Sequence, residues 1–271
     1  MDKIIFSNRA LEQANFVSKF LKINHKIRKA IILGTGWKKS LPFEVKSNIE
    51  FSDIPGFIKL PEIRGHERSL GVGTFKGENV IVLNGRVHLN EIPQSEIVTK
   101  MARWQIQLLY YLGVRKLIST SAVGSISHID KGSVAIIKDF FTLFSPTVLF
   151  GGEFSHITKA LHPRLKSMAF NIGKEIFGKR IHLATHAMVR GPRLETEDDQ
   201  SFLSRTNAQI VGMSQLPDAE IISLYRGFYM LGLCFVTNKS GDKSTHEDNL
   251  KKAFQHQDEL RDYIAALLPM I

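Results

Sequence analysis

Cysteine is almost absent from this sequence, because Cys234 is the single thiol among 271 residues. An intramolecular disulfide is therefore excluded, and we expect a reducing compartment, the cytoplasm. Cys234 lies in the apolar run GLCFVTN. A thiol in such a run usually packs as a small hydrophobic side chain, so we give Cys234 no catalytic role.

Long hydrophobic runs are also missing. No apolar run approaches the roughly 18 residues that are needed to span a bilayer, and the opening MDKIIFSNRA lacks the continuous apolar core of a secretory signal. With 43% hydrophobic and 23% charged residues, the composition is that of an ordinary globular protein. The length suits one large α/β domain, and we find no internal repeat, linker or low-complexity tract.

Acidic residues are scarce relative to basic ones, with 26 Asp and Glu against 36 Lys and Arg and a formal net charge of +10. Residues 1–48 alone contain ten Lys or Arg and three Asp or Glu. A basic region can bind nucleic acid, but recognised RNA- or DNA-binding motifs and aromatic interleaving are absent. We interpret the charge as a solvated face whose field would also favour an anionic substrate.

Short apolar runs alternate with stretches of helical period, which predicts an α/β fold with one sheet and one domain over residues 1–271. The expected strands are 30–33, 80–83, 116–120, 134–137, 180–189, 210–213 and 231–237. The expected helices are 8–22 with Asn8 as N-cap, 93–112, 158–177, one that begins with a capping box of Thr196 and Asp199, 217–232, and 245–268. Short strands and loops are expected over 42–75, a second small-residue turn over 121–125, and a long loop over 140–157.

The stretch VIVLNGRVH, Val80–His88, carries the clearest chemical signal. Its four opening apolar residues predict a strand buried on both faces. Arg86 and His88 follow at the carboxyl end and, two residues apart in an extended segment, point the same way. Ligands bind at that edge of open α/β sheets, and a guanidinium fork suits phosphate or carboxylate oxygens. The stretch predicts an anion site, for phosphate.

Other polar or small residues occupy the same kind of position, directly after an apolar run. They are Thr35 in a Gly-Thr-Gly turn, Ser121 and Ala122, Glu195, Ser214 and Asn238. If these edges converge, their side chains suit an anion beside a hydrogen-bonding heterocycle. The set does not resemble a nucleophile triad, because the sequence contains no G-x-S-x-G elbow.

A metal site is not predicted. His182 and His186 have the i, i+4 spacing of a metal-binding helix. The expected strand 180–189 would instead place them roughly 13 Å apart.

Eight short motifs stand in one order over about residues 30–250, namely LGTG (33–36), GH (65–66), NGRVH (84–88), TSAVGS (120–125), GPRLET (191–196), VGMS (211–214), VTNK (236–239) and HE (246–247). The ordered set resembles the purine nucleoside phosphorylases of the trimeric type, a family that includes methylthioadenosine phosphorylase. The resemblance implies a mixed, distorted, barrel-like central sheet and a homotrimer. It also implies phosphorolysis, in which inorganic phosphate is a co-substrate and no further cofactor is needed.

Carried over from the family, the phosphate-binding set is Thr35, His66, Arg86, His88, the Ala122 backbone amide and Ser214. The resemblance also places Met213 against the ribose and His246 near the 5′-hydroxyl. In the reaction, phosphate attacks the anomeric carbon while the purine departs, and fixed charges and dipoles stabilise the oxocarbenium-like sugar between them.

The choice of base falls, by the same resemblance, to Glu195 and Asn238. In the family such a Glu accepts from N1–H of a 6-oxopurine, and such an Asn contacts O6 and N7, whereas Asp at the second position accompanies 6-aminopurines. Guanosine and inosine are therefore the expected substrates, since a wrong base would leave buried polar groups unpaired. We expect His88, Glu195 and Asn238 to be the catalytic residues.

Two residues depart from the family pattern. Asn90 stands where a Tyr usually lies near the sugar, and Leu194 where a Phe packs on the base; losing a ring contact costs on the order of 1 kcal/mol. The 140–157 loop also lacks the family's Gly-Pro-Asn signature, although Phe154 is a candidate for the aromatic that a neighbouring subunit offers to the ribose. These departures keep open a phosphorylase for methylthioadenosine or another atypical nucleoside. A third reading is a non-catalytic purine-binding or nucleic-acid-binding relative, with the basic first 48 residues as its only support.

Overall fold

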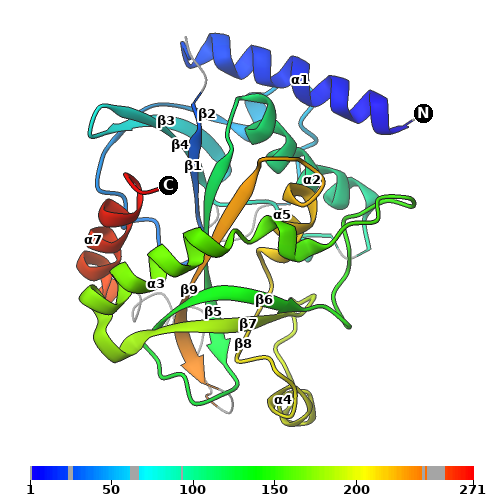
Figure 1. Cartoon of the computed structure of the whole chain (residues 1–271). Coiled ribbons are helices and arrows are strands. Elements are labelled where there is room, and N and C mark those ends of the chain that lie inside the picture. Colours follow the sequence, from blue (N-terminus) through cyan, green and yellow to red (C-terminus); the bar gives the residue numbers. More distant parts are fainter. Residues whose placement is uncertain (1, 24–26, 62–66, 93, 240–241, 243–253) are drawn as a thin grey trace.

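The computed structural model describes residues 2–23, 27–61, 67–92, 94–239, 242 and 254–271. Figure 1 shows one mixed sheet with helices on both sides. The strands are β1 (Lys29–Leu33), β2 (Val45–Glu50), β3 (Ser69–Phe75), β4 (Glu78–Asn84), β5 (Lys116–Ser125), β6 (Val134–Phe141), β7 (Ile181–Met188), β8 (Ile210–Gly212) and β9 (Tyr229–Lys239). The α-helices are α1 (Asp2–Phe20), α2 (Glu96–Tyr111), α3 (Pro163–Phe177), α4 (Glu197–Ser204), α5 (Leu216–Ile222) and α7 (Gln257–Leu267).

The strand order shows that part of the sheet closes on itself. The order is β2-β3-β4-β1-β5-β8-β7-β6-β9, and β5 also pairs with β9. The five strands from β5 to β9 therefore form a distorted barrel, and the other four continue from β5 as an open extension. Parallel and antiparallel pairs both occur, so the mixed, barrel-like sheet that the resemblance implies is confirmed.

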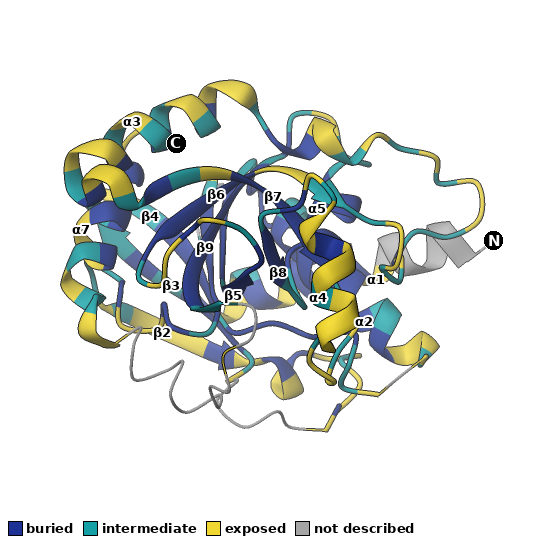
Figure 2. Ribbon diagram, turned by 90° about the horizontal axis from the view of Figure 1, so that it is seen from below, coloured by how far each residue is buried: buried dark blue, intermediate teal, exposed yellow. Residues whose placement is uncertain are grey.

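The central strands β1, β4 and β5 are buried on both faces, as the run Val80–Leu83 predicts, whereas the edge strand β2 is mostly exposed. The two faces of β1 belong to two different hydrophobic cores. Ile32 packs with residues of α1, α2 and α5, and Ile31, on the opposite face, packs with residues of α3 and α7. Figure 2 shows the corresponding pattern, with dark strands enclosed by helices whose outer faces are exposed. No helix in the described part of the chain has the length and hydrophobicity required to cross a membrane.

Four strands share one direction. β1 is parallel to β4 and to β5, and β5 is parallel to β9. The residues that follow β1 and β4, and the last residues of β5 and β9, therefore lie toward the same edge of the sheet. This edge includes Thr35, Arg86, His88, Ala122 and Asn238.

Several expected boundaries are wrong. The helix expected from Asn8 begins at Asp2, so Asn8 is not its N-cap. The helix expected over 158–177 begins at Pro163, after a short 3-10 turn over Ile157–Ala160. α2 begins at Glu96, where the Ser95 side chain accepts from the Val98 amide.

Three other corrections concern the sheet or the elements next to it. The expected turn over 121–125 is strand, because β5 continues to Ser125 with β9 on one side and β8 on the other. The helix expected over 217–232 ends at Ile222, and β9 begins at Tyr229. β6 likewise extends to Phe141, so the long loop starts two residues later than expected. The start expected for the last helix, at residue 245, lies outside the described residues.

Candidate active site

The predicted phosphate-binding segments converge on the middle of β5. The amide of Gly34 donates to the Thr120 hydroxyl oxygen at 2.9 Å, and that hydroxyl donates to the carbonyl of Ile32 at 2.7 Å. A Cβ atom at Gly34 would lie only 2.2 Å from the Thr120 carbonyl oxygen. Glycine is therefore required here for the turn of Thr35 to lie directly against β5.

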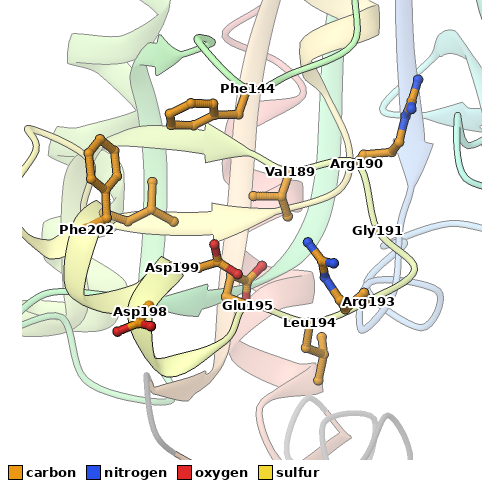
Figure 3. A pocket seen from close by; sticks show the side chains of 11 residues that line it. Phe144, Val189, Arg190, Gly191, Arg193, Leu194, Glu195, Asp198, Asp199 and Phe202 are labelled. Atoms are coloured by element: carbon orange, nitrogen blue, oxygen red, sulfur yellow. The ribbon is translucent and has the colours of Figure 1, made fainter.

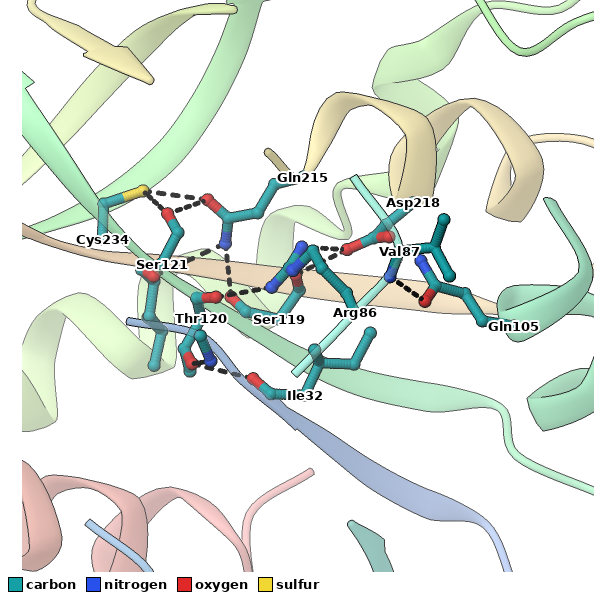
Figure 4. A network of polar contacts seen from close by, with 12 residues as sticks. Ile32, Arg86, Val87, Gln105, Ser119, Thr120, Ser121, Gln215, Asp218 and Cys234 are labelled. Atoms are coloured by element: carbon teal, nitrogen blue, oxygen red, sulfur yellow. Dashed lines mark hydrogen bonds and ion pairs between the residues drawn. The ribbon is translucent and has the colours of Figure 1, made fainter. Parts of the chain in front are cut away.

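Arg86 reaches the same part of β5 from the segment after β4 (Figure 4). Its Nη2 donates to the Thr120 carbonyl oxygen at 2.5 Å, and its Nη1 lies 2.6 Å from Oδ2 of Asp218 in α5. The residue as a whole is 2% exposed. The structure thus places a fixed positive charge beside Thr120, two residues before Ala122.

Ser214 is brought to β5 by its neighbour, Gln215. The Gln215 side chain is fully buried; its Nε2 donates to the Ser119 carbonyl at 2.5 Å, and its Oε1 accepts from the Ser121 hydroxyl at 2.8 Å (Figure 4). Gln215 has a φ of 72°, a left-handed conformation that is uncommon for a residue with a side chain. These bonds fix the segment that carries Ser214 against the strand that carries Ala122.

His88 is buried and forms a hydrogen bond with a second acidic residue, Glu91, besides the Asp218 that contacts Arg86. Its backbone amide donates to Oε1 of Glu91 at 2.8 Å, and Glu91 Oε2 forms an ion pair with Arg68 at 3.1 Å. Burial, together with the nearby Arg86 charge, lowers the pKa of His88 to about 3. The imidazole is therefore neutral at pH 7, with one nitrogen that donates and one that accepts.

Cys234 also lies in this buried region and has no nucleophilic character. Its side chain is fully buried, and its thiol donates to Gln215 Oε1 at 3.1 Å (Figure 4). Burial raises the pKa of the thiol to about 12. The interpretation of Cys234 as a packed side chain is confirmed.

Three of the predicted nucleoside-binding residues, Asn90, Met213 and Asn238, take part in two further contacts. The Asn238 carboxamide lies against Gly124, where a Cβ would stand 3.0 Å from Nδ2, and Gly124 pairs with Asn238 in the β5–β9 register. Asn90 Nδ2 donates to Met213 Sδ at 3.7 Å. The loop after β7 packs over that pair, because a Cβ at Gly191 would lie 2.2 Å from the Met213 sulfur.

Glu195 and Leu194 line a cavity of about 560 Å³ between the loop after β6 and the segment that leads into α4 (Figure 3). Of the predicted phosphate-binding residues that the structure describes, none lines this cavity. Burial raises the pKa of Glu195, a hydrogen bond from its own backbone amide opposes that rise, and the Asp199 charge adds to it. The predicted capping box of Thr196 and Asp199 at the start of α4 is confirmed.

Comparison with known proteins matches residues 28–269 to a family described as the phosphorylase superfamily. Purine nucleoside phosphorylase 1 of Bacillus subtilis is 30% identical over 241 residues, which are 85% of each chain. The purine nucleoside phosphorylase of Schistosoma mansoni, solved in complex with adenosine, superposes with a TM-score of 0.83, 25% identity and 96% coverage of both chains. A probable 6-oxopurine nucleoside phosphorylase of Thermococcus kodakarensis is 28% identical over 207 residues, 70% of this chain and 76% of that protein.

This chain belongs to the phosphorylase superfamily. The three relatives described above are purine nucleoside phosphorylases, and the family predicted from the ordered motifs is therefore confirmed.

Not every predicted site residue of this phosphorylase is placed. His66 and His246 lie outside the described residues. Ala122 is half-buried although Ser121 and Val123 on either side are buried, so this point of β5 is accessible. Leu194, expected near the base, is 65% exposed.

Sequence reasoning missed the partners of the phosphate set. Asp218 resembles an ordinary acidic residue in the first turn of a helix, where it would complement the helix dipole, and no spacing relates it to Arg86. Gln215 looks like one more polar loop residue. The contact of Glu91 with His88 could have been predicted from the sequence, because the two residues are only three positions apart.

Proposed function

We propose that this phosphorylase cleaves 6-oxopurine nucleosides, guanosine and inosine, with inorganic phosphate to give the free base and ribose 1-phosphate. The observation that carries the proposal is the convergence of the Thr35 turn, Arg86 and the Ser214 segment on residues 119–122 of β5, beside Asn238. An anion held there lies next to a carboxamide that suits a purine. Membership in the superfamily supplies the reaction class.

The proposed reaction needs no nucleophile from the protein. A phosphate oxygen forms the new bond to the anomeric carbon, and the bond from that carbon to the purine nitrogen breaks with its electron pair leaving on the base. Arg86 and the neutral His88 hold the phosphate, while Asn238 Nδ2 donates to N7 as negative charge builds there. Glu195 accepts from N1–H of the purine, which favours a 6-oxo over a 6-amino base.

The decisive experiment is a turnover panel of guanosine, inosine, adenosine and methylthioadenosine, each with phosphate, with sulfate and with neither. We expect guanosine and inosine to yield free base and ribose 1-phosphate only when phosphate is present. Cleavage without phosphate would indicate a hydrolase, and a lack of turnover of all four nucleosides would refute the proposal.

A phosphorylase for methylthioadenosine or another atypical nucleoside is the second candidate. It is favoured by Asn90, which replaces a ring near the sugar, and by the exposed Leu194, which replaces a ring on the base. In the panel this candidate predicts a higher kcat/KM for methylthioadenosine than for inosine.

We also propose that the phosphorylase is a cytoplasmic homotrimer. The loop after β6 is fastened to α2, since Arg103 pairs with Glu153 at 2.8 Å and donates to the Val148 carbonyl at 2.6 Å. Phe154, next to this anchor, is 96% exposed. A neighbouring subunit that receives Phe154 at its ribose site would account for that exposure. Light scattering should give three times the 30.6 kDa of one chain, and Phe154→Ala should raise the nucleoside KM in the trimer.

A further inference from the structure

Arg86 is held by a buried carboxylate that sequence analysis does not connect with it. Asp218 Oδ2 lies 2.6 Å from Arg86 Nη1 and accepts from the Ser119 hydroxyl at 2.8 Å (Figure 4). The side chains of Arg86 and Asp218 are 3% and 1% exposed. Charge-assisted hydrogen bonds of this kind fix geometry strongly, and removing one partner leaves the other as an uncompensated buried charge.

The three nitrogens of the Arg86 guanidinium differ in their hydrogen-bond partners. A guanidinium has five N–H groups; Nη1 serves Asp218 and Ser119, and Nη2 donates to the Thr120 carbonyl. Nε is buried and has no hydrogen-bond partner among the described residues. Nε and Nη2 share one edge of the guanidinium plane, the edge that can bind an oxyanion with two parallel hydrogen bonds.

A buried donor without a partner destabilises a folded protein, so its presence calls for an explanation. A phosphate oxygen at the Nε edge would supply the missing acceptor. The partners of Nη1 and Nη2 come from α5 and β5, so they fix the rotation of the guanidinium and thereby the direction in which Nε points.

We propose that Asp218, supported by Ser119, is a positioning residue that orients the Nε edge of Arg86 toward phosphate, an inference that rests on the proposed function. Asp218 does not itself contact the phosphate. It holds the Arg86 side chain in the binding orientation before phosphate arrives, so little side-chain freedom is lost on binding. It also balances the charge of the buried guanidinium while the site is empty.

The same short segment links both sides of the phosphate site. Asp218 lies four residues after Ser214, and Gln215 between them is bonded to the Ser119 carbonyl and the Ser121 hydroxyl. Ser119 thus contacts the segment twice, through its carbonyl to Gln215 and through its hydroxyl to Asp218. One structural unit therefore places Ser214 and orients Arg86.

The test compares Asp218→Asn with Glu220→Gln in steady-state kinetics. Glu220 is a matched control, because it is a second buried carboxylate of α5 and it bonds to Thr147 and Val148 instead of Arg86. We expect Asp218→Asn to raise the phosphate KM about tenfold or more, with the nucleoside KM at saturating phosphate within about twofold of wild type. Glu220→Gln should leave the phosphate KM unchanged. An equal rise in both variants would overturn the proposal, because it would reflect a general disturbance of α5.

A milder variant keeps the proposal testable if Asp218→Asn does not fold. Ser119→Ala removes one hydrogen bond to Asp218 and the longer one that Ser119 accepts from Arg86 Nη1 at 3.3 Å, and it should raise the phosphate KM about threefold. Binding is measured independently as the rise in Tm with inorganic phosphate alone, which Asp218→Asn should reduce and Glu220→Gln should retain. If wild type neither binds phosphate nor turns over, the proposed function fails. If wild type is active and the Asp218 and Ser119 variants keep its phosphate KM, this inference alone fails.

Discussion

Asn90 Nδ2 donates to Met213 Sδ at 3.7 Å, a contact between residues 123 positions apart in the sequence. Gly191 covers both groups, since a Cβ there would lie 2.9 Å from Asn90 Nδ2 and 2.2 Å from the Met213 sulfur. The segments after β4, β7 and β8 therefore pack on one another at the predicted ribose side of the site. Asn90 takes part in this packing although a polar amide replaces the ring that the family usually has there.

Asn90→Ala tests whether this cluster serves the sugar. Removing the carboxamide leaves the Met213 side chain without its hydrogen-bond donor, so we expect the nucleoside KM to rise about fivefold. The phosphate KM should stay within about twofold, because Arg86 and Ser214 are untouched. Steady-state kinetics with each substrate varied in turn provide the measurement, and Asn207→Ala, at an exposed position, is the control. A rise in the phosphate KM alone would place Asn90 elsewhere in the mechanism.

Asn238→Asp tests the assignment of base specificity. The Thr237 hydroxyl donates to Asn238 Oδ1 at 3.0 Å, which identifies Nδ2 as the group beside Gly124. An ionised Asp cannot donate to N7, so we expect kcat/KM for guanosine to fall about 100-fold. The ratio of adenosine to guanosine kcat/KM should rise. The exposed Asn207→Asp introduces the same charge away from the site and should keep the wild-type ratio. An unchanged ratio in Asn238→Asp would remove Asn238 from base recognition.

The edge of the sheet was predictable because its signal is local. An apolar run followed by a polar residue marks the end of a buried parallel strand, and parallel strands place their ends together. That rule anticipates the neighbourhood of Thr35, Arg86 and Asn238. The roles of these residues in catalysis stay predictions until the variants are measured.

The errors arise where tertiary pairing overrides local preference. Residues 121–125 are small and turn-like, yet β8 and β9 pair with them on both sides and extend the strand. Gly232 follows a stretch of helical period, as a glycine at the end of a helix would. It lies instead inside β9, where a Cβ would stand 2.7 Å from Ile137 Cδ1. Its role is close packing against the neighbouring strand β6. The contact of Asp218 with Arg86 joins residues 132 positions apart and leaves no trace in local spacing.

Gly34→Ala tests whether the Thr35 turn must lie directly against β5. The new Cβ would stand 2.2 Å from a backbone oxygen, that of Thr120, so the strands would have to separate. We expect a loss of about 3 kcal/mol in the free energy of unfolding, measured by urea denaturation, and a higher phosphate KM. Gly151→Ala is the matched control, because a Cβ there meets no atom within 4 Å, and its effect should stay within about 0.5 kcal/mol. Equal stability of the two variants would show that β1 and β5 can adjust.

His186→Leu tests how buried histidines set the acid sensitivity of the fold. His186 in β7 is fully buried, packs 5.7 Å from the Phe140 ring, and its ring nitrogens have no hydrogen-bond partner among the described residues. Burial and the Arg86 charge lower its pKa to about 3. The unfolded chain, with a histidine pKa near 6.5, therefore binds more protons than the folded protein between about pH 6.5 and pH 3.

Because the folded protein keeps His186 neutral, the free energy of unfolding is highest above about pH 6.5 and decreases as the pH falls toward 3. One such histidine accounts for about 2 kcal/mol of the free energy of unfolding between pH 7 and pH 5. His186→Leu should remove that share of the pH dependence and, because it deletes two unpaired polar atoms at similar volume, keep stability at pH 7 close to wild type. Urea denaturation at pH 7, 6 and 5 measures both effects. His156→Leu, at an exposed histidine, should keep the wild-type slope. A His186→Leu slope equal to that of wild type would mean that His186 takes up its proton as readily in the folded protein as in the unfolded chain.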